Sequence, residues 1–175
     1  PGHFYYMPHG FEIYNSQNIR VTDVTIENTQ DGIYFEQIED VHVTKVNSSN
    51  ARYGLHFMYA KNILIDNNKV HNNTTGLMLM IVENVEVTNN TILRQLALNS
   101  IGLYIYDVKN AVIHNNEFLE NTVATVWHNV TDTKFEQNLF QANSTVVQAT
   151  KSPEVVLRDN VMIGNILVAR SDKVG

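Results

Sequence analysis

The chain has 175 residues, a formal net charge of −6 and no cysteine. The acidic balance argues against a nucleic-acid partner, which normally meets a basic surface. The missing cysteines exclude both a disulfide framework and a thiolate metal site. No apolar stretch approaches the ~18 residues that a transmembrane helix needs, so we expect no membrane span in this sequence.

Glycine recurs at a constant interval in the first part of the chain, and small or apolar residues continue the series. Taken as the first position of each repeat, these residues are Gly10, Gly32, Gly54, Gly76, Gly102, Ala124, Val146 and Val168. The spacing is 22 residues throughout, except for one step of 26 between Gly76 and Gly102. A fixed period of this length is the signature of a solenoid, in which each repeat forms one rung of a coil.

Each repeat is predicted to hold two strands with one buried face and a third, weaker strand. Apolar residues occupy the second and fourth positions, as Leu55 and Phe57 do, and again the tenth and twelfth, as Ile63 and Ile65 do. This alternation is typical of a strand whose side chains point inwards and outwards in turn. The third stretch is centred on Ile26, Val70, Ile92, Phe118, Phe140 and Met162.

These patterns together predict the fold class. Equivalent residues that recur at a constant period imply parallel stacking, and parallel crossovers are right-handed by default. We therefore expect an all-β protein, a single-stranded right-handed parallel β-helix of about 22 residues per rung with seven to eight rungs. One domain spans residues 1–175, and the partial rungs at both ends predict that it is a fragment of a longer solenoid.

Asparagine recurs in three columns, which we interpret as structural. Asn tolerates the left-handed backbone conformation that tight corners require, and stacked amides can hydrogen-bond along the coil. The first column is Asn18, Asp40, Asn62, Asn84, Asn110 and Asp132; the second is Asn68, Asn90, Asn116, Asn138 and Asn160; the third is Asn73, Asn121, Asn143 and Asn165.

The outward positions of the first strand carry an unusual set of side chains in the middle rungs. His56 and Met58 occupy the third and fifth positions of one rung, and Met78 and Met80 occupy them in the next. Outward neighbours are ~6.7 Å apart along a strand and ~4.8 Å apart between rungs, so the four form a small quadrilateral. Imidazole and thioether ligands suit Cu(I) rather than Mg²⁺ or Ca²⁺. A Met-rich protein interface, or a face covered by a segment outside this sequence, are the other interpretations.

Further residues are expected to support this face. They are Glu36, Arg52, Tyr53, Tyr59, Tyr104 and Tyr106. Arg52 is placed to pair with Glu36 or Asp31, or to hold an anion, and simple stabilisation of the corner is the alternative. The single longer repeat, between Asn90 and Gly102, lies beside the same face. Insertions in solenoids usually map to the working surface, and chance drift of a loop is the alternative.

Four runs of sequence carry a more specific signal. They are Asp31–Glu36, Arg52–Ala60, Gly76–Met80 and, after the longer repeat, Gly102–Asp107. The run Arg-Tyr-Gly-Leu-His-Phe-Met-Tyr-Ala is the most distinctive, because a generic rung does not require it. Over about residues 30–165 the sequence resembles the NosD family.

The resemblance implies a role as well as a fold. NosD proteins are extracytoplasmic, periplasmic β-helices that assist maturation of the copper centre of nitrous oxide reductase, together with an ABC transporter. It therefore implies a non-enzymatic accessory protein with Cu(I) as the handled ion and those two proteins as partners. The residues that match the family pattern are Arg52, Tyr53, Gly54, His56, Met58, Tyr59 and Met80, whereas Met78 matches less closely.

Two other classes of function remain open. Parallel β-helices also carry polysaccharide lyases, hydrolases and epimerases, and the fold alone does not exclude them. Glu12 and Glu36 lie ~8 Å apart by strand and rung spacings, within the ~6.5–9.5 Å range of an inverting glycosidase. An epimerase-like Asp-Pro-His element is missing, because Met7 stands before Pro8 and His9. The remaining class is a purely structural solenoid.

Overall fold

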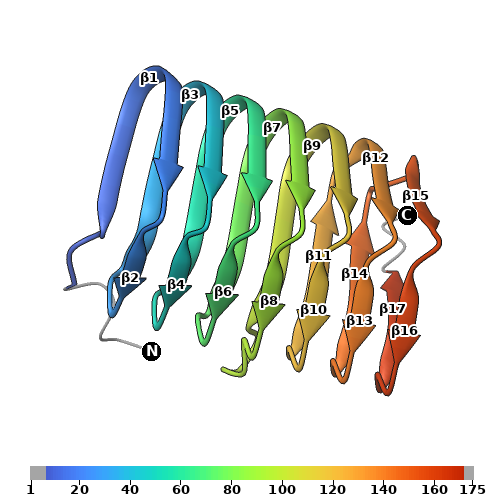
Figure 1. The fold of residues 1–175 in the computed structure, drawn as a ribbon. Helices are drawn as coiled ribbons and strands as arrows, with labels where there is room; N and C mark the ends of the chain where they lie inside the picture. The colour runs from blue at the N-terminus through green and yellow to red at the C-terminus, as the bar shows by residue number, and fades with distance from the viewer. Residues whose placement is uncertain (1–6, 172–175) are drawn as a thin grey trace.

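The computed structural model describes residues 7–171, which form strands and connecting loops without a helix. Figure 1 shows the rungs side by side in chain order, from β1 and β2 at the blue end to β16 and β17 at the red end. A ten-stranded parallel sheet follows the order β1-β3-β5-β7-β9-β11-β14-β17, with β12 and β15 paired beside β9. A seven-stranded sheet follows β2-β4-β6-β8-β10-β13-β16. Within the described residues no helix has the length and apolar character needed to cross a membrane.

The strands fall into three groups. The long strands are β1 (Phe11–Thr22), β3 (Asp31–Thr44), β5 (Tyr53–Asp66), β7 (Thr75–Thr88) and β9 (Ile101–His114). The divided strands are β11 (Val123–His128), β12 (Thr131–Glu136), β14 (Thr145–Thr150), β15 (Val155–Arg158) and β17 (Leu167–Ser171). The short strands are β2 (Thr25–Glu27), β4 (Asn47–Ser49), β6 (Lys69–His71), β8 (Thr91–Leu93), β10 (Glu117–Leu119), β13 (Leu139–Gln141) and β16 (Val161–Ile163).

The predicted rung register is confirmed. Ile33 pairs with Leu55, Leu55 with Leu77, and Leu77 with Leu103, all between parallel strands. The first two steps are 22 residues and the last is 26, as the glycine spacing requires. The all-β solenoid expected from the repeat is therefore present, with its equivalent residues stacked in columns.

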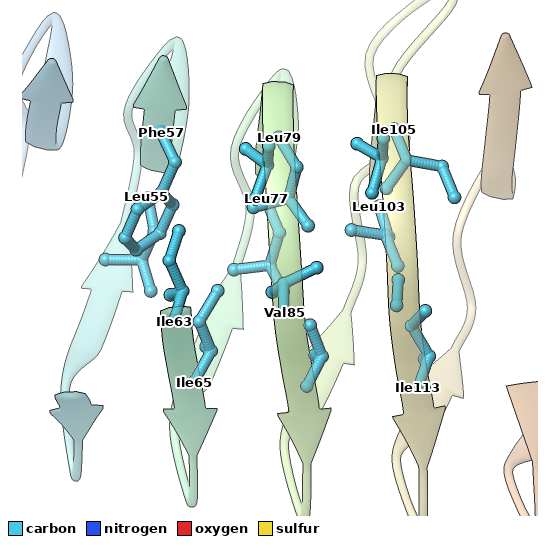
Figure 2. Close-up of a cluster of buried hydrophobic side chains, with 14 of the residues drawn as sticks. Leu55, Phe57, Ile63, Ile65, Leu77, Leu79, Val85, Leu103, Ile105 and Ile113 are labelled. Carbon is cyan, nitrogen blue, oxygen red and sulfur yellow. The ribbon is translucent and has the colours of Figure 1, made fainter. Parts of the chain in front are cut away.

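The apolar columns form one continuous core. Figure 2 shows the side chains of β5, β7 and β9 meeting inside the coil. Leu55, Phe57, Ile65, Leu77 and Leu79 are each 0% exposed. Every rung adds the same inward positions, so burial on this scale follows from stacking alone and needs neither a disulfide nor a second layer.

The glycine column is required by the close approach of successive rungs. A Cβ built at Gly32 would lie 2.3 Å from the carbonyl oxygen of Gly54, and one at Gly54 would lie 2.6 Å from the carbonyl oxygen of Gly76. Contacts this short are forbidden, so a side chain at either position would push adjacent rungs apart.

The two long strands predicted in each rung are a single bent strand in the first five rungs. β5 turns at Tyr59 and Asn62, both with φ of 54°, and its pairing continues on either side of the bend. Later rungs divide the same path, first into β11 and β12 and then into β14 and β15. Residues in the left-handed conformation bend the strand while its backbone pairing with the next rung continues. The sequence pattern shows the bend as a break, so it predicted two separate strands.

The three asparagine columns serve two different purposes. The first column adopts the left-handed conformation, as at Asn62 (φ 54°) and Asn84 (φ 58°). The second and third columns are buried except at their last members, Asn160 and Asn165, which are half-buried. The residue before each asparagine makes the turn instead, as Asn89 does with φ 56°. Asn90 donates from Nδ2 to the backbone oxygen of Ile65 at 2.9 Å and to Oδ1 of Asn116 at 3.0 Å. These amides form ladders that tie each rung to the next.

The longer repeat keeps its ladder and extends only the following corner. Gln95 takes the third-column position between Asn73 and Asn121, is 0% exposed, and donates from Nε2 to the backbone oxygen of Val70 at 2.9 Å. The extra chain is therefore residues 96–99. Leu96 and Leu98 in this loop are 63% and 90% exposed.

A substitution in the core tests the inward assignment. Ile65→Asn should destabilise the protein by several kcal/mol, because it adds a buried amide without a partner, at about 1–3 kcal/mol, to the lost apolar burial. Lys61→Asn is the control, since Lys61 is exposed, and its effect should stay below about 0.5 kcal/mol. Chemical denaturation followed by circular dichroism measures both. Equal shifts in the two variants would contradict the assignment.

The same chemical change in two asparagine columns separates the buried ladder from the exposed corner. Asn90→Asp replaces the amide donor of a buried ladder with a carboxylate that faces another oxygen, and should cost about 3 kcal/mol. Asn84→Asp retains an acceptor on an exposed left-handed residue and should cost less than about 1 kcal/mol. Thermal melts at neutral pH compare the two. A ladder that contributed nothing would leave both melting temperatures alike.

Candidate functional site

The candidate residues lie on the outward side of β3, β5, β7 and β9, before the bend. One column runs through Tyr34, His56, Met78 and Tyr104, and the next runs through Glu36, Met58, Met80 and Tyr106. The structure therefore brings His56, Met58, Met78 and Met80 together on adjacent strands, in the predicted quadrilateral. We call these four residues, together with the flanking Tyr34, Tyr53, Tyr104 and Tyr106, the Met–His face.

The Met–His face is more covered than its outward position led us to expect. His56 is 7% exposed and Met78 is 8% exposed, whereas Met58 and Met80 are half-buried. The rings of Tyr34 and Tyr53 both meet the His56 ring edge-on, at 4.8 Å between centroids. The expectation of an exposed face is therefore wrong for His56 and Met78, and the rings of Tyr34 and Tyr53 account for the covering of His56.

A buried carboxylate holds His56 in place. Asp31, the first residue of β3, is 0% exposed and its Oδ2 lies 3.0 Å from Nδ1 of His56. Arg52, at the corner before β5, donates from Nε to Oδ1 and from Nη2 to Oδ2, both at 2.9 Å. Of the partners proposed for Arg52, the structure confirms Asp31. The guanidinium carbon of Arg52 also lies 4.5 Å from the centre of the Tyr53 ring, a cation–π contact.

The electrostatics of this cluster favour the ionised carboxylate. Burial by itself raises the pKa of Asp31, but the hydrogen bonds from His56 and Arg52 outweigh it and place the pKa below its usual value of 3.8. On the other side of Asp31, Nδ1 of His9 lies 3.7 Å from Oδ2. A negative charge is thus fixed directly behind the imidazole.

A tyrosine of the first column contacts two residues of the second column. The hydroxyl of Tyr34 donates to Oε2 of Glu36 at 2.9 Å and lies 3.4 Å from Sδ of Met58. Burial and the Glu36 carboxylate both raise the pKa of Tyr34. Met58 is therefore anchored against a neutral phenol, and Glu36 supports the face through that phenol.

Sequence reasoning did not include Asp31 or Tyr34 among the site residues. A signal for Asp31 was present, because it is the one acid in its column of the sequence. The equivalent positions in other rungs are His9, Tyr53, Thr75, Ile101, Val123, Thr145 and Leu167. An acid in such a column needs a specific partner when it is buried. The identity of that partner depends on side-chain geometry across rungs, which the column alone does not define.

The other predicted supporting residues are spread more widely. Tyr106 stacks on His128 with ring centres 4.9 Å apart, and burial raises the pKa of Tyr104. Tyr59 is at the bend, 47% exposed, and lies off the Met–His face. With Lys61 it lines two shallow cavities, of about 410 and 430 Å³, on either side of its ring.

The face has no hard-metal site among the described residues. No three His, Asp or Glu side chains of residues 7–171 are grouped so that they could hold a metal ion. A metal bound here would depend on the thioethers of Met58, Met78 and Met80 together with His56. Such ligands select a soft ion such as Cu(I).

The carboxylates of the rival glycosidase hypothesis have other partners. Oε1 of Glu12 lies 3.4 Å from Nε2 of His9, and Glu36 accepts the Tyr34 hydroxyl. A glycosidase pair must flank a substrate with one carboxyl protonated and the other ionised. Glu12 and Glu36 are both engaged by neighbouring side chains of this chain.

Comparison with solved structures finds the same fold in an epimerase of low sequence identity. Two variants of the periplasmic alginate epimerase AlgG superpose with TM-scores of 0.78 and 0.76 at 16% and 15% identity. The matches cover 89% and 94% of this chain and 39% of the epimerase in both cases. PfbA, a surface adhesin of Streptococcus pneumoniae, has a TM-score of 0.49 at 12% identity over 95% of this chain and 59% of its own.

The chain thus spans about two fifths of the length of the epimerase, and at such identities the likeness concerns the fold alone. No curated protein matches this sequence. A family model described as "Periplasmic copper-binding protein (NosD)" matches residues 2–173, which is nearly the whole chain. The resemblance seen in the sequence is thereby confirmed, and the chain belongs to the NosD family.

Proposed function

We propose that this protein binds Cu(I) at the Met–His face and takes part in assembling the copper centre of nitrous oxide reductase. The observation that carries the proposal is the register of β5 and β7. His56 pairs with Met78, and Met58 pairs with Met80, so one imidazole and three thioethers occupy adjacent corners of a single sheet. The family description as copper-binding supports the same ion.

The chemistry of these four side chains suits transfer of copper rather than permanent storage. Thioethers are neutral, polarizable ligands that bind Cu(I) without needing deprotonation, and methionine side chains adapt easily to a changing geometry. Met58 and Met80 are half-buried, so their sulfur atoms lie near the surface where a donor or acceptor protein would approach. Copper is in this view a cargo, and the protein does no covalent chemistry on it.

A rigid support explains why the ligands are placed on a sheet. Each strand of the face is fixed on both sides by parallel pairing and beneath by the apolar core. Sites built on strands hold their geometry better than sites on loops. The periplasmic location of the family, nitrous oxide reductase as client and an ABC transporter as partner belong to this proposal.

The proposal predicts that Cu(I) binding depends on the sulfur atoms of the face and not on its apolar area. Replacing Met58, Met78 and Met80 together with Leu keeps volume and hydrophobicity but removes three ligands. Saturable Cu(I) binding, measured by competition with a colorimetric Cu(I) chelator under reducing conditions, should be lost in this variant. Met162→Leu is the matched control, because this thioether lies on β16 at the far end of the solenoid, and its binding should equal that of the wild type.

The outcomes distinguish a metal site from a docking patch. Retained Cu(I) binding in the triple Leu variant would contradict the metal site. Reductase maturation that survives the triple Leu variant but fails in Met80→Glu would instead indicate apolar contact with a partner. If neither variant affects maturation in a complementation assay, the loop at residues 96–99 becomes the next surface to examine.

A further inference from the structure

His56 contains a buried nitrogen that the rest of the described structure leaves without a partner. Nε2 of His56 is shielded from solvent and makes no hydrogen bond with any described residue. The surrounding rings of Tyr34 and Tyr53 offer it only their edges and faces. Buried polar atoms are almost always paired, so an unpaired one requires an explanation. Nδ1 of His9 in the same cluster also makes no hydrogen bond, but the Asp31 carboxylate lies 3.7 Å from it.

The hydrogen bond at the other ring nitrogen defines where the proton lies. Both oxygens of Asp31 accept hydrogen bonds from the Arg52 guanidinium, which favours the ionised carboxylate. An ionised carboxylate can only accept, and therefore Nδ1 of His56 donates to it. A doubly protonated ring would bury a charged N–H at Nε2 without an acceptor. The neutral ring with a bare Nε2 is the form that fits this environment.

The bare nitrogen is directed away from the carboxylate. The two nitrogens of an imidazole point to opposite sides of the ring, so Nε2 points away from Asp31 on the preceding rung. On the following rung the same column holds Met78, which is 8% exposed and pairs with His56 in register. Adjacent rungs are ~4.8 Å apart, a spacing that one ion between the two side chains can bridge.

We propose that Asp31, anchored by Arg52, is the positioning residue that presents Nε2 of His56 to Cu(I) between the rungs of β5 and β7. The inference rests on the proposed copper-binding function and deepens it, since it names the ligating atom and adds two residues that do not touch the ion. A carboxylate behind a metal-binding histidine fixes its tautomer and ring orientation, and loss of such a partner commonly lowers metal affinity about 10–100-fold.

The tautomer can be measured directly in the wild-type protein. With ¹⁵N-labelled histidine, and His56→Gln to assign the signal, NMR should show the proton of His56 on Nδ1 and a bare Nε2. Addition of Cu(I) alone should shift the Nε2 resonance and leave the Nδ1 proton in place. A proton on Nε2 in the metal-free protein, or a metal-induced shift at Nδ1 instead, would overturn the inference even where variants fail to fold.

Substitution at Asp31 provides the second measurement. Asp31→Asn lets an amide donate to Nδ1, which moves the His56 proton to Nε2, and should weaken Cu(I) binding about 10–100-fold. Glu39→Gln is the control: it removes an exposed carboxylate from the same strand, β3, at the bend and off the Met–His face, and should leave affinity within about threefold. Circular dichroism confirms that both variants are folded.

The two proposals fail in different ways. If the triple Leu variant loses Cu(I) but Asp31→Asn binds it like the wild type, the copper site stands and the role of Asp31 is wrong. An equal loss in Asp31→Asn and Glu39→Gln would assign the effect to net charge, and would also refute the positioning role. Absence of Cu(I) binding by the wild type overturns both proposals together.

Discussion

Hydrogen bonding between equivalent residues of successive rungs is the constraint on which the molecule depends. A strand in this fold has no partner from its own neighbourhood in sequence, since each pairs with strands one full rung away. The buried Asn68, Asn90 and Asn116 then repeat that bond at the corners, where the backbone has left the sheet. A side chain that pushed two rungs apart would weaken both the backbone ladder and the asparagine ladder. Glycine avoids this, because a Cβ at its position would meet a carbonyl oxygen of the next rung. The geometry of the Met–His face is a product of the same spacing.

Much of this architecture was readable from the sequence because it is one-dimensional. A column such as Ile33, Leu55, Leu77 and Leu103 reports burial directly, since every rung places the same position at the same depth. The bent strands were predicted as separate halves, because Tyr59 and Ile81 adopt left-handed backbone angles that asparagine usually signals. A tyrosine or a β-branched residue in a sequence does not predict such a turn. The grouping of His56 with three methionines followed from register alone, but the covering of His56 did not, since it depends on how the rings of Tyr34 and Tyr53 tilt.

The Met–His face combines an adaptable outer edge with a rigid inner one. Met58 and Met80 are half-buried, and the thioether is the most flexible ligand the face offers. His56, by contrast, is held by a carboxylate that is itself held by a guanidinium fork, and two aromatic rings enclose it. The proposed ion would therefore meet two partly accessible thioethers beside one fixed imidazole.

The loop after Gln95 shows how this solenoid accommodates change. Gln95 keeps the ladder bonds that an asparagine makes elsewhere, and the added residues begin only after it. Chain length at that corner is therefore independent of rung register: residues can be gained or lost there in the course of evolution while the strands on either side stay in phase. Paralogues built on the same rungs can diverge in what they recognise by altering such corners, and keep the chemistry of the sheet unchanged.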